Sequence, residues 1–234
     1  MKLSSASGSS LPKDIPSPNC DARPGGAAID MLVIHYTGMQ SADAALARLT
    51  DPASQVSAHY LIDEDGSVIR LVSEDKRAWH AGVSSWRGRA GVNATSIGIE
   101  LVNPGHEFGY RAFPEPQMSA LESLGREILA RHPIPSRNVV GHSDVAPTRK
   151  CDPGELFDWP RLAAAGVGLW PRTEDMAAAP EDQVAPLLAA FGYDVTDERA
   201  AVVAFQRHFA RHRLDGVADP ATRRILAALI AGVA

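Results

Sequence analysis

The most regular pattern in the chain is a series of short apolar runs with the composition of β-strands. Met31–Tyr36 (MLVIHY) and Ser96–Val102 (SIGIELV) are rich in strand-forming residues and predict two buried strands. Val56–Ile62 and Val68–Val72 flank a polar, glycine-containing stretch, so we expect them to form a hairpin. Asn138–Gly141 predicts one further, brief strand.

Helical patterns alternate with these runs. Ser41–Leu49 is a short candidate helix, and Glu115–His132 places its apolar residues near one helical face. Residues 1–30 contain several prolines and glycines, which is typical of an extended lead-in with turns. We therefore predict an α/β fold with a mixed central β-sheet flanked by helices.

The composition changes between Trp170 and Pro180, where proline, charged residues and an alanine run predict a linker. Beyond it, apolar residues recur at helical spacing in three groups: Val184 to Phe191, Val202 to Phe209 and Ile225 to Ile230. We therefore predict a small three-helix C-terminal domain at residues 181–231, after a larger domain at residues 16–171. We expect the linker to let each unit fold alone.

Composition excludes several classes of protein. The net charge of -5 has the wrong sign for binding a polyanion, so no nucleic-acid partner is predicted. Cys20 and Cys151 are too few for a disulfide framework, and no apolar run reaches the roughly 20 residues that span a bilayer. Met1–Ser10 lacks the apolar stretch of a secretory signal. We expect a cytoplasmic protein, or a periplasmic or envelope-associated one if an export segment is missing from this chain.

Two histidines lie at the ends of predicted strands. His35 closes the first strand and His142 follows the last one, so both could point into one cleft, although either alone is more often structural. Asp152 comes ten residues after His142. Two imidazoles and a carboxylate form the three-ligand set, with an open fourth position, of catalytic zinc. Cys151 is a competing ligand, but in extended backbone it faces opposite to Asp152, so only one of them can join the site.

Strand alternation separates Glu100 from the apolar face made by Ile97, Ile99 and Leu101. A carboxylate on a core strand is costly, so Glu100 either forms a salt bridge to an arginine or acts as a general base toward the attacking water. Lys150 has two interpretations as well. It is either a solvated surface charge or the cation that stabilises the oxyanion formed during attack on an amide.

Several motifs combine these residues: Ile34–Thr37 (IHYT), Val56–Tyr60 (VSAHY), Ala78–Gly82 (AWHAG), Ser96–Glu100 (SIGIE), Gly141–Asp144 (GHSD) and Lys150–Gly154 (KCDPG). In this order, across residues 16–171, they resemble the zinc-dependent N-acetylmuramoyl-L-alanine amidases of type 2, which cut the bond between muramic acid and the stem peptide. The resemblance implies Glu100 as catalytic base and Lys150 as oxyanion partner. It implies three Zn2+ ligands: His35, His142 and Asp152. It also suggests three substrate-binding positions in the cleft: His59, Trp79 and His80.

The chain departs from the phage-lysozyme branch of this superfamily. In that branch a tyrosine precedes the histidine of the hairpin motif and assists catalysis, whereas here that place is Ala58, and Tyr60 is not expected to take the role. The same branch uses cysteine as the third zinc ligand at the place of Asp152, and Cys151 is not its equivalent. The branch that uses aspartate is the better match.

Residues 181–231 resemble the small helical peptidoglycan-binding domain, although we expect Phe205 and Phe209 to be core residues. The combined expectation is zinc-dependent hydrolysis of the amide between N-acetylmuramic acid, in its ordinary or 1,6-anhydro form, and L-alanine of peptidoglycan or muropeptides, in cell-wall turnover or recycling. A non-catalytic peptidoglycan recognition protein is the alternative, and retention of every ligand together with Glu100 and Lys150 argues against it. A third interpretation is that the helical unit docks a protein partner. The sequence predicts no oligomeric state.

Overall fold

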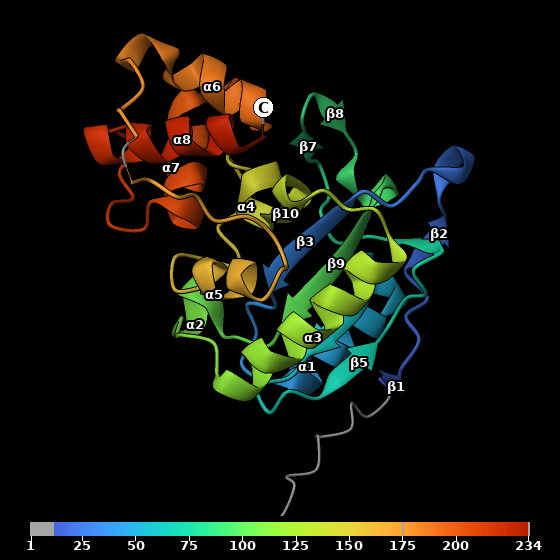
Figure 1. Cartoon of the computed structure of the whole chain (residues 1–234). Helices are drawn as coiled ribbons and strands as arrows, with labels where there is room; N and C mark the ends of the chain where they lie inside the picture. The colour runs from blue at the N-terminus through green and yellow to red at the C-terminus, as the bar shows by residue number, and fades with distance from the viewer. Residues whose placement is uncertain (1–11, 175, 234) are drawn as a thin grey trace, which may run out of the picture.

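The centre of the molecule is a mixed β-sheet with the strand order β1-β5-β4-β9-β3-β10 (Figure 1). The computed structural model describes residues 12–174 and 176–233. β4 and β5 pair antiparallel, as the predicted hairpin requires, and the other neighbours pair parallel. The strands are β1 (Lys13–Asp14), β5 (Val68–Arg70), β4 (Tyr60–Ile62), β9 (Ser96–Leu101), β3 (Met31–Tyr36) and β10 (Val139–Gly141). The predicted mixed sheet flanked by helices is confirmed.

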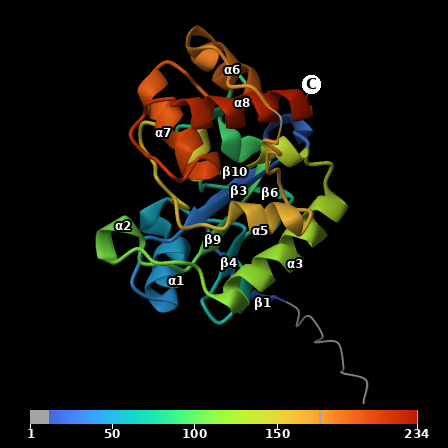
Figure 2. The same ribbon diagram turned by 60° about the vertical axis from the view of Figure 1, so that its left-hand side comes forward.

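Side-chain alternation gives the sheet two apolar faces. Leu32 and Ile34 of β3 belong to the cluster covered by α3 (Glu115–Arg131) and α5 (Trp159–Ala164). Met31 and Val33 belong to a second cluster on the opposite face. On that face α1 (Ala42–Thr50) covers β4, and α4 (His142–Val145) follows β10. Figure 2 shows α1 and α3 on opposite sides of the sheet.

The lead-in and the hairpin differ in detail from the prediction. The lead-in contributes β1 to the sheet edge and β2 (Cys20–Ala22), which pairs with β6 (Lys76–Ala78). β4 and β5 are shorter than predicted. The backbone N–H of Ser57 donates to the Trp79 carbonyl outside the sheet, and the N–H groups of Leu71 and Val72 both donate to the His59 carbonyl, which interrupts the regular pairing. The remaining short elements are β7 (Ser85–Trp86), β8 (Arg89–Ala90), α2 (Gly105–Phe108) and 3-10 turns at Pro24–Gly26, Pro52–Ser54, Val92–Ala94, Ser136–Asn138 and Glu181–Gln183.

Three helices form the C-terminal unit, as predicted: α6 (Val184–Phe191), α7 (Glu198–Phe209) and α8 (Pro220–Val233). The Asp197 carboxylate accepts a hydrogen bond from the Ala200 N–H and caps α7, and Asp219 caps α8 in the same way through Thr222. Proline at the first position of α8 needs no N–H partner, which suits a helix start. The chain before the unit, from Gly166 to Pro180, contains no helix or strand in its described residues.

The helical unit packs on the sheet instead of standing apart from it. One buried cluster contains Met31, Val33 and Val140 of the sheet together with Phe191 and Phe205 of the helices. In Figure 1 the helices lie directly against α4 and the β3–β10 side of the sheet. Separating the two units would expose apolar surface on both sides, so we predict that neither is as stable alone as in the full chain. No helix in the described part of the chain is long and apolar enough to cross a membrane.

Candidate active site

The site begins with the register of two parallel strands. In the β3–β9 pair, His35 lies opposite Glu100, so both side chains project from the same face of the sheet. The apolar residues Ile34 and Ile99 are also paired and face the other way, into the core under α3. The alternation predicted for Glu100 is thus confirmed. Parallel pairing brings two chemically active residues together that are far apart in the sequence.

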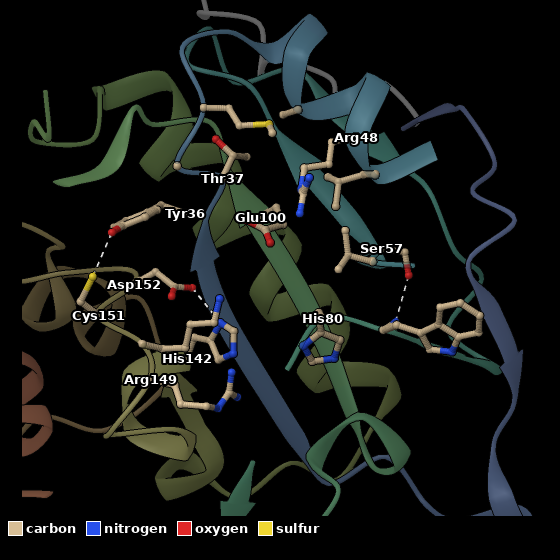
Figure 3. Close-up of a pocket in the computed structure, with 17 residues that line it drawn as sticks. Tyr36, Thr37, Arg48, Ser57, His80, Glu100, His142, Arg149, Cys151 and Asp152 are labelled. Carbon is tan, nitrogen blue, oxygen red and sulfur yellow. Dashed lines mark hydrogen bonds and ion pairs between the residues drawn. The ribbon is translucent and has the colours of Figure 1, made fainter. Parts of the chain in front are cut away.

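Three side chains on this face could hold a metal ion: His35, His142 and Asp152. Figure 3 shows His142 and Asp152 turned toward each other. The Nδ1 atoms of His35 and His142 are 2.9 Å apart, and Asp152 Oδ2 lies 3.1 Å and 3.0 Å from them. All three residues are buried. The two histidines favour ionised Asp152, and although burial opposes ionisation, the pKa of Asp152 lies far below its ordinary value.

A relay of hydrogen bonds fixes the tautomer of His35. Ser96 Oγ donates to the Val92 carbonyl (2.7 Å), so at 3.0 Å it accepts the Nε2–H of His80. His80 Nδ1 is then unprotonated and accepts the Nε2–H of His35 at 3.0 Å. Burial keeps both rings neutral: it lowers the pKa of His35 to about 4, with the help of His142, and it lowers the pKa of His80 well below its ordinary value. The relay leaves a lone pair on His35 Nδ1, facing the other two groups.

His142 is oriented by a backbone carbonyl. Its Nε2–H donates to the Ala81 carbonyl at 3.1 Å, which leaves Nδ1 as the unprotonated nitrogen. Arg149 donates to the same carbonyl at 3.1 Å and also hydrogen-bonds to the Val83 carbonyl. The three converging atoms are therefore all acceptors. Acceptors this close to one another repel unless a cation lies between them, so the arrangement suits a metal ion.

Glu100 is a partly buried carboxyl group at the wall of a cavity that His142 and Asp152 also line. Its Oε2 is buried and has no hydrogen-bond partner in the described structure. Burial raises the pKa of Glu100 well above its ordinary value, the Asp152 charge adds to the rise, and Lys150 opposes it. No arginine pairs with Glu100 in the described residues, which argues against the salt-bridge interpretation. An acid with a raised pKa at a cavity wall is suited to proton transfer.

A cavity of about 360 Å3 opens over these groups. Lys150 and Trp79 line it, together with His80 and Glu100. Lys150 is exposed and Trp79 is partly buried. The exposed Arg48 of α1 also lines the cavity and was not predicted, because a single arginine on a short helix has no distinctive sequence pattern.

His59 differs from the expectation. It is fully buried and is not among the residues that line the cavity. Its Nδ1 accepts the Gly98 N–H at 3.0 Å, and Nε2 contacts Arg23 at 3.1 Å. Arg23 also donates to the Ser96 carbonyl at 2.9 Å, so the predicted lead-in supplies a residue that holds β9 from behind the site. The structure therefore gives His59 a structural place, which contradicts its predicted position in the cleft.

Cys151 and Tyr60 lie outside the metal-binding group. Cys151 Sγ points toward Tyr36, whose hydroxyl lies 3.1 Å away, while the neighbouring Asp152 turns toward the histidines (Figure 3). This is the opposition expected for adjacent residues in extended chain. The Tyr60 hydroxyl donates to Glu74 at 2.7 Å, away from the cavity, as the departure from the phage-lysozyme pattern predicts.

Known proteins resemble this chain in sequence and in fold. The family model described as N-acetylmuramoyl-L-alanine amidase matches residues 25–155, more than half of the chain. The chain belongs to this amidase family. It is 41% identical over 230 residues to N-acetylmuramoyl-L-alanine amidase AmiD of Escherichia coli (strain K12), covering 86% of this chain and 82% of AmiD. It is 38% identical to 1,6-anhydro-N-acetylmuramyl-L-alanine amidase AmpD of Salmonella typhimurium (strain SL1344), covering 64% of this chain and 87% of AmpD.

A solved structure extends the likeness to the whole fold. AmiD from E. coli, in complex with the substrate anhydro-N-acetylmuramic acid-L-Ala-D-gamma-Glu-L-Lys, superposes with a TM-score of 0.80 at 39% identity. The superposition covers 91% of this chain and 92% of AmiD, a span too large to leave out the helical unit. The chain is thus an N-acetylmuramoyl-L-alanine amidase, an enzyme that hydrolyses an amide of the cell-wall polymer or its fragments.

Proposed function

We propose that this amidase is a zinc enzyme whose metal is held by His35, His142 and Asp152. The observation that supports this most strongly is the convergence of three acceptor atoms within 3.1 Å of one another, with each histidine oriented by a partner behind it. Two neutral imidazoles and a carboxylate match the ligand preference of catalytic zinc, which keeps a fourth position open. When bound, zinc would polarise the scissile carbonyl and lower the pKa of water.

The chain's own residues would then carry the proton and the charge. Glu100 would take the proton of the attacking water and return it to the departing amine of L-alanine. Lys150 would stabilise the negative oxygen of the tetrahedral intermediate from the rim of the cavity. Trp79, which also lines the cavity, would contact substrate. His80 would act through His35 instead of touching substrate, since both of its ring nitrogens are occupied.

We further propose that the substrate carries the 1,6-anhydro sugar and reaches the enzyme as a muropeptide in cell-wall recycling. The support comes from AmiD and AmpD, because the first is known in complex with an anhydro-muropeptide and the second is named for the anhydro sugar. The resemblance of residues 181–231 to peptidoglycan-binding domains supports a second contact with intact wall. Mass spectrometry of products from intact sacculi and from a soluble anhydro-muropeptide, run side by side, would establish which substrate is preferred.

Metal analysis tests the catalytic proposal directly. We expect one zinc per chain after purification without chelator, and loss of that metal in Asp152→Ala. Cys151→Ala is the matched control and should retain the metal, because Sγ lies outside the ligand group. Zinc well below one per chain in an active preparation would contradict the proposal. Bound zinc without any product release would instead favour the non-catalytic receptor.

Hydrogen exchange of the full chain tests the second contact. An inactive Glu100→Gln protein mixed with soluble glycan strands should show protection in residues 181–231 as well as around the cleft. Protection confined to the cleft would contradict a wall-binding role for the helices and favour the interpretation in which they dock a protein partner.

A further inference from the structure

A buried carboxylate joins the helical unit to the catalytic domain. Asp144 lies in α4, two residues after His142, and has no exposed surface. Its Oδ1 accepts the hydroxyl of Tyr193 at 2.7 Å. Its Oδ2 accepts the Nδ1–H of His208 and the backbone N–H of Gly141, each at 2.7 Å. Every carboxylate oxygen is thus bound, and both side-chain donors come from the helical unit.

The two donors are themselves held in place. Tyr193 follows α6 and is 3% exposed, and its ring packs edge-on to Trp86 with 5.1 Å between centroids. His208 of α7 is also 3% exposed and stacks on Trp159, with 3.7 Å between centroids. Removing the donors would leave a carboxylate buried without its partners, which is unfavourable unless the surrounding chain moves.

The turn that Asp144 closes also carries the metal-binding residues. Its bond to the Gly141 N–H spans the first turn of α4, and His142 is the first residue of that turn. The N–H of Ser143 donates to the Asp152 carbonyl at 2.9 Å, so the same turn holds the segment of the carboxylate ligand. Two of the three residues that converge on the cavity are therefore attached to the turn that Asp144 stabilises.

We propose that Tyr193 and His208 are positioning residues for the metal site. Through Asp144 they hold the first turn of α4, and with it His142 and Asp152, in the arrangement that binds the ion. The helical unit thereby completes the catalytic centre, a role separate from any contact with cell wall. The inference rests on the proposed zinc site.

The test removes the donors and keeps the ring shapes. In Tyr193→Phe with His208→Phe, both hydrogen bonds to Asp144 are lost while the aromatic packing stays. We expect zinc affinity, measured by competition with a chromogenic chelator, to fall about 10- to 100-fold, as for other groups that orient metal ligands. His208→Asn combined with Tyr193→Phe keeps an N–H donor near the place of Nδ1 and should recover part of that loss. Tyr193→Phe alone removes only one oxygen atom and one of the two side-chain hydrogen bonds to Asp144, and it should weaken zinc binding several-fold.

Leu226→Ala is the matched control for a general loss of stability. Leu226 is 1% exposed in the core of the helical unit, so its truncation should lower the unfolding temperature and leave zinc affinity within about twofold. Equal affinity in the double variant and the wild type would overturn the positioning role alone. The positioning role would also be overturned if Leu226→Ala weakened zinc binding as much as the double variant does. It would be overturned as well if His208→Asn with Tyr193→Phe recovered none of the lost affinity. A wild-type chain that binds no zinc would overturn the metal site itself and this inference with it.

Discussion

Glu100 combines two requirements that oppose each other. A general base must be ionised, yet burial and the nearby Asp152 charge favour the protonated form. Lys150 on the cavity rim offsets part of that effect, and a cation held by the three converging residues would offset more. The catalytic base and the ion are therefore coupled: the base is in its useful form when the site is loaded.

Glu100→Gln should keep the metal and lose turnover. An amide cannot accept the proton of the attacking water, so we expect product release to fall by about 100- to 10,000-fold while metal content stays near the wild-type value. Glu127→Gln, an exposed residue on α3, is the control and should leave both quantities unchanged. Near-normal turnover in Glu100→Gln would assign the base to another group.

Glu74 makes the fold sensitive to acid. Its carboxylate accepts hydrogen bonds from Tyr60, Arg131 and His132, each at 2.7 Å. Burial alone would raise its pKa, but these partners lower the pKa to about 2, against 4.5 in its ordinary state. Because the folded state has the lower pKa, the stabilisation is complete above about pH 4.5 and disappears as pH falls toward 2.

Glu74→Gln should therefore lower the free energy of unfolding at pH 7 by at most about 3 kcal/mol and matter progressively less below pH 4.5. Urea unfolding of both proteins between pH 7 and pH 2.5 measures this difference. A difference that stays constant over that range would mean that the lost hydrogen bonds, and not the carboxylate charge, account for the effect.

At the scale of elements, β9 supports the relay through a glycine. A Cβ atom placed on Gly98 would lie 2.5 Å from the His80 ring, so only a residue without a side chain lets that ring lie against the strand. The His80 ring in turn accepts the Nε2–H of His35. The strand that presents Glu100 thus also fixes how closely the His80 ring approaches it, and so the position from which His80 accepts the hydrogen bond of His35.

Gly98→Ala should displace His80 and break its bond to His35. We expect metal affinity to fall by about tenfold or more and the unfolding temperature to drop, measured by chelator competition and calorimetry. Gly232→Ala, where the added methyl group meets no neighbour, is the matched control and should leave affinity unchanged. Unaltered metal binding in Gly98→Ala would show that His80 does not orient His35.

Sequence periodicity predicted the elements that are long enough to show a period, such as β3, β9, α3 and the three C-terminal helices. β1, β2 and the other elements of two or three residues carry no period, and only their partners define them. The same limit applies to side chains. The alternation of β9 was enough to single out Glu100, whereas the burial of His59 depends on Arg23, which lies in a segment that the pattern assigns to turns.

At the scale of the whole molecule, the proline- and alanine-rich chain before α6 joins two units that pack against each other. Its composition predicts a linker, but the core that spans Val33, Val140 and Phe205 depends on residues far apart in sequence, which no local pattern reports. The apolar faces of the helices could be predicted, and the surface against which they pack could not.

A chain ending at residue 171 should consequently be a damaged enzyme. It would expose the face of the sheet that the helices cover, so we expect an unfolding temperature lower by at least about 10 °C, at about 2–4 °C per kcal/mol lost, and binding of a hydrophobic dye. Calorimetry and dye fluorescence on both lengths measure this. If the truncated protein were as stable as the full chain and bound no dye, the result would support two units that fold independently.

The shared core fixes the position of the helical unit relative to the cavity, and this affects how the enzyme would bind a polymer. When a binding domain is joined to a catalytic domain by a flexible linker, it raises the local concentration of substrate at the catalytic domain without fixing the orientation of that substrate. Here the helices and the cavity form a single packed body, so any wall strand gripped by the helices would meet the catalytic groups at one fixed offset and angle. The fixed distance between the helical unit and the cavity would then determine which amide of a bound strand reaches the catalytic groups.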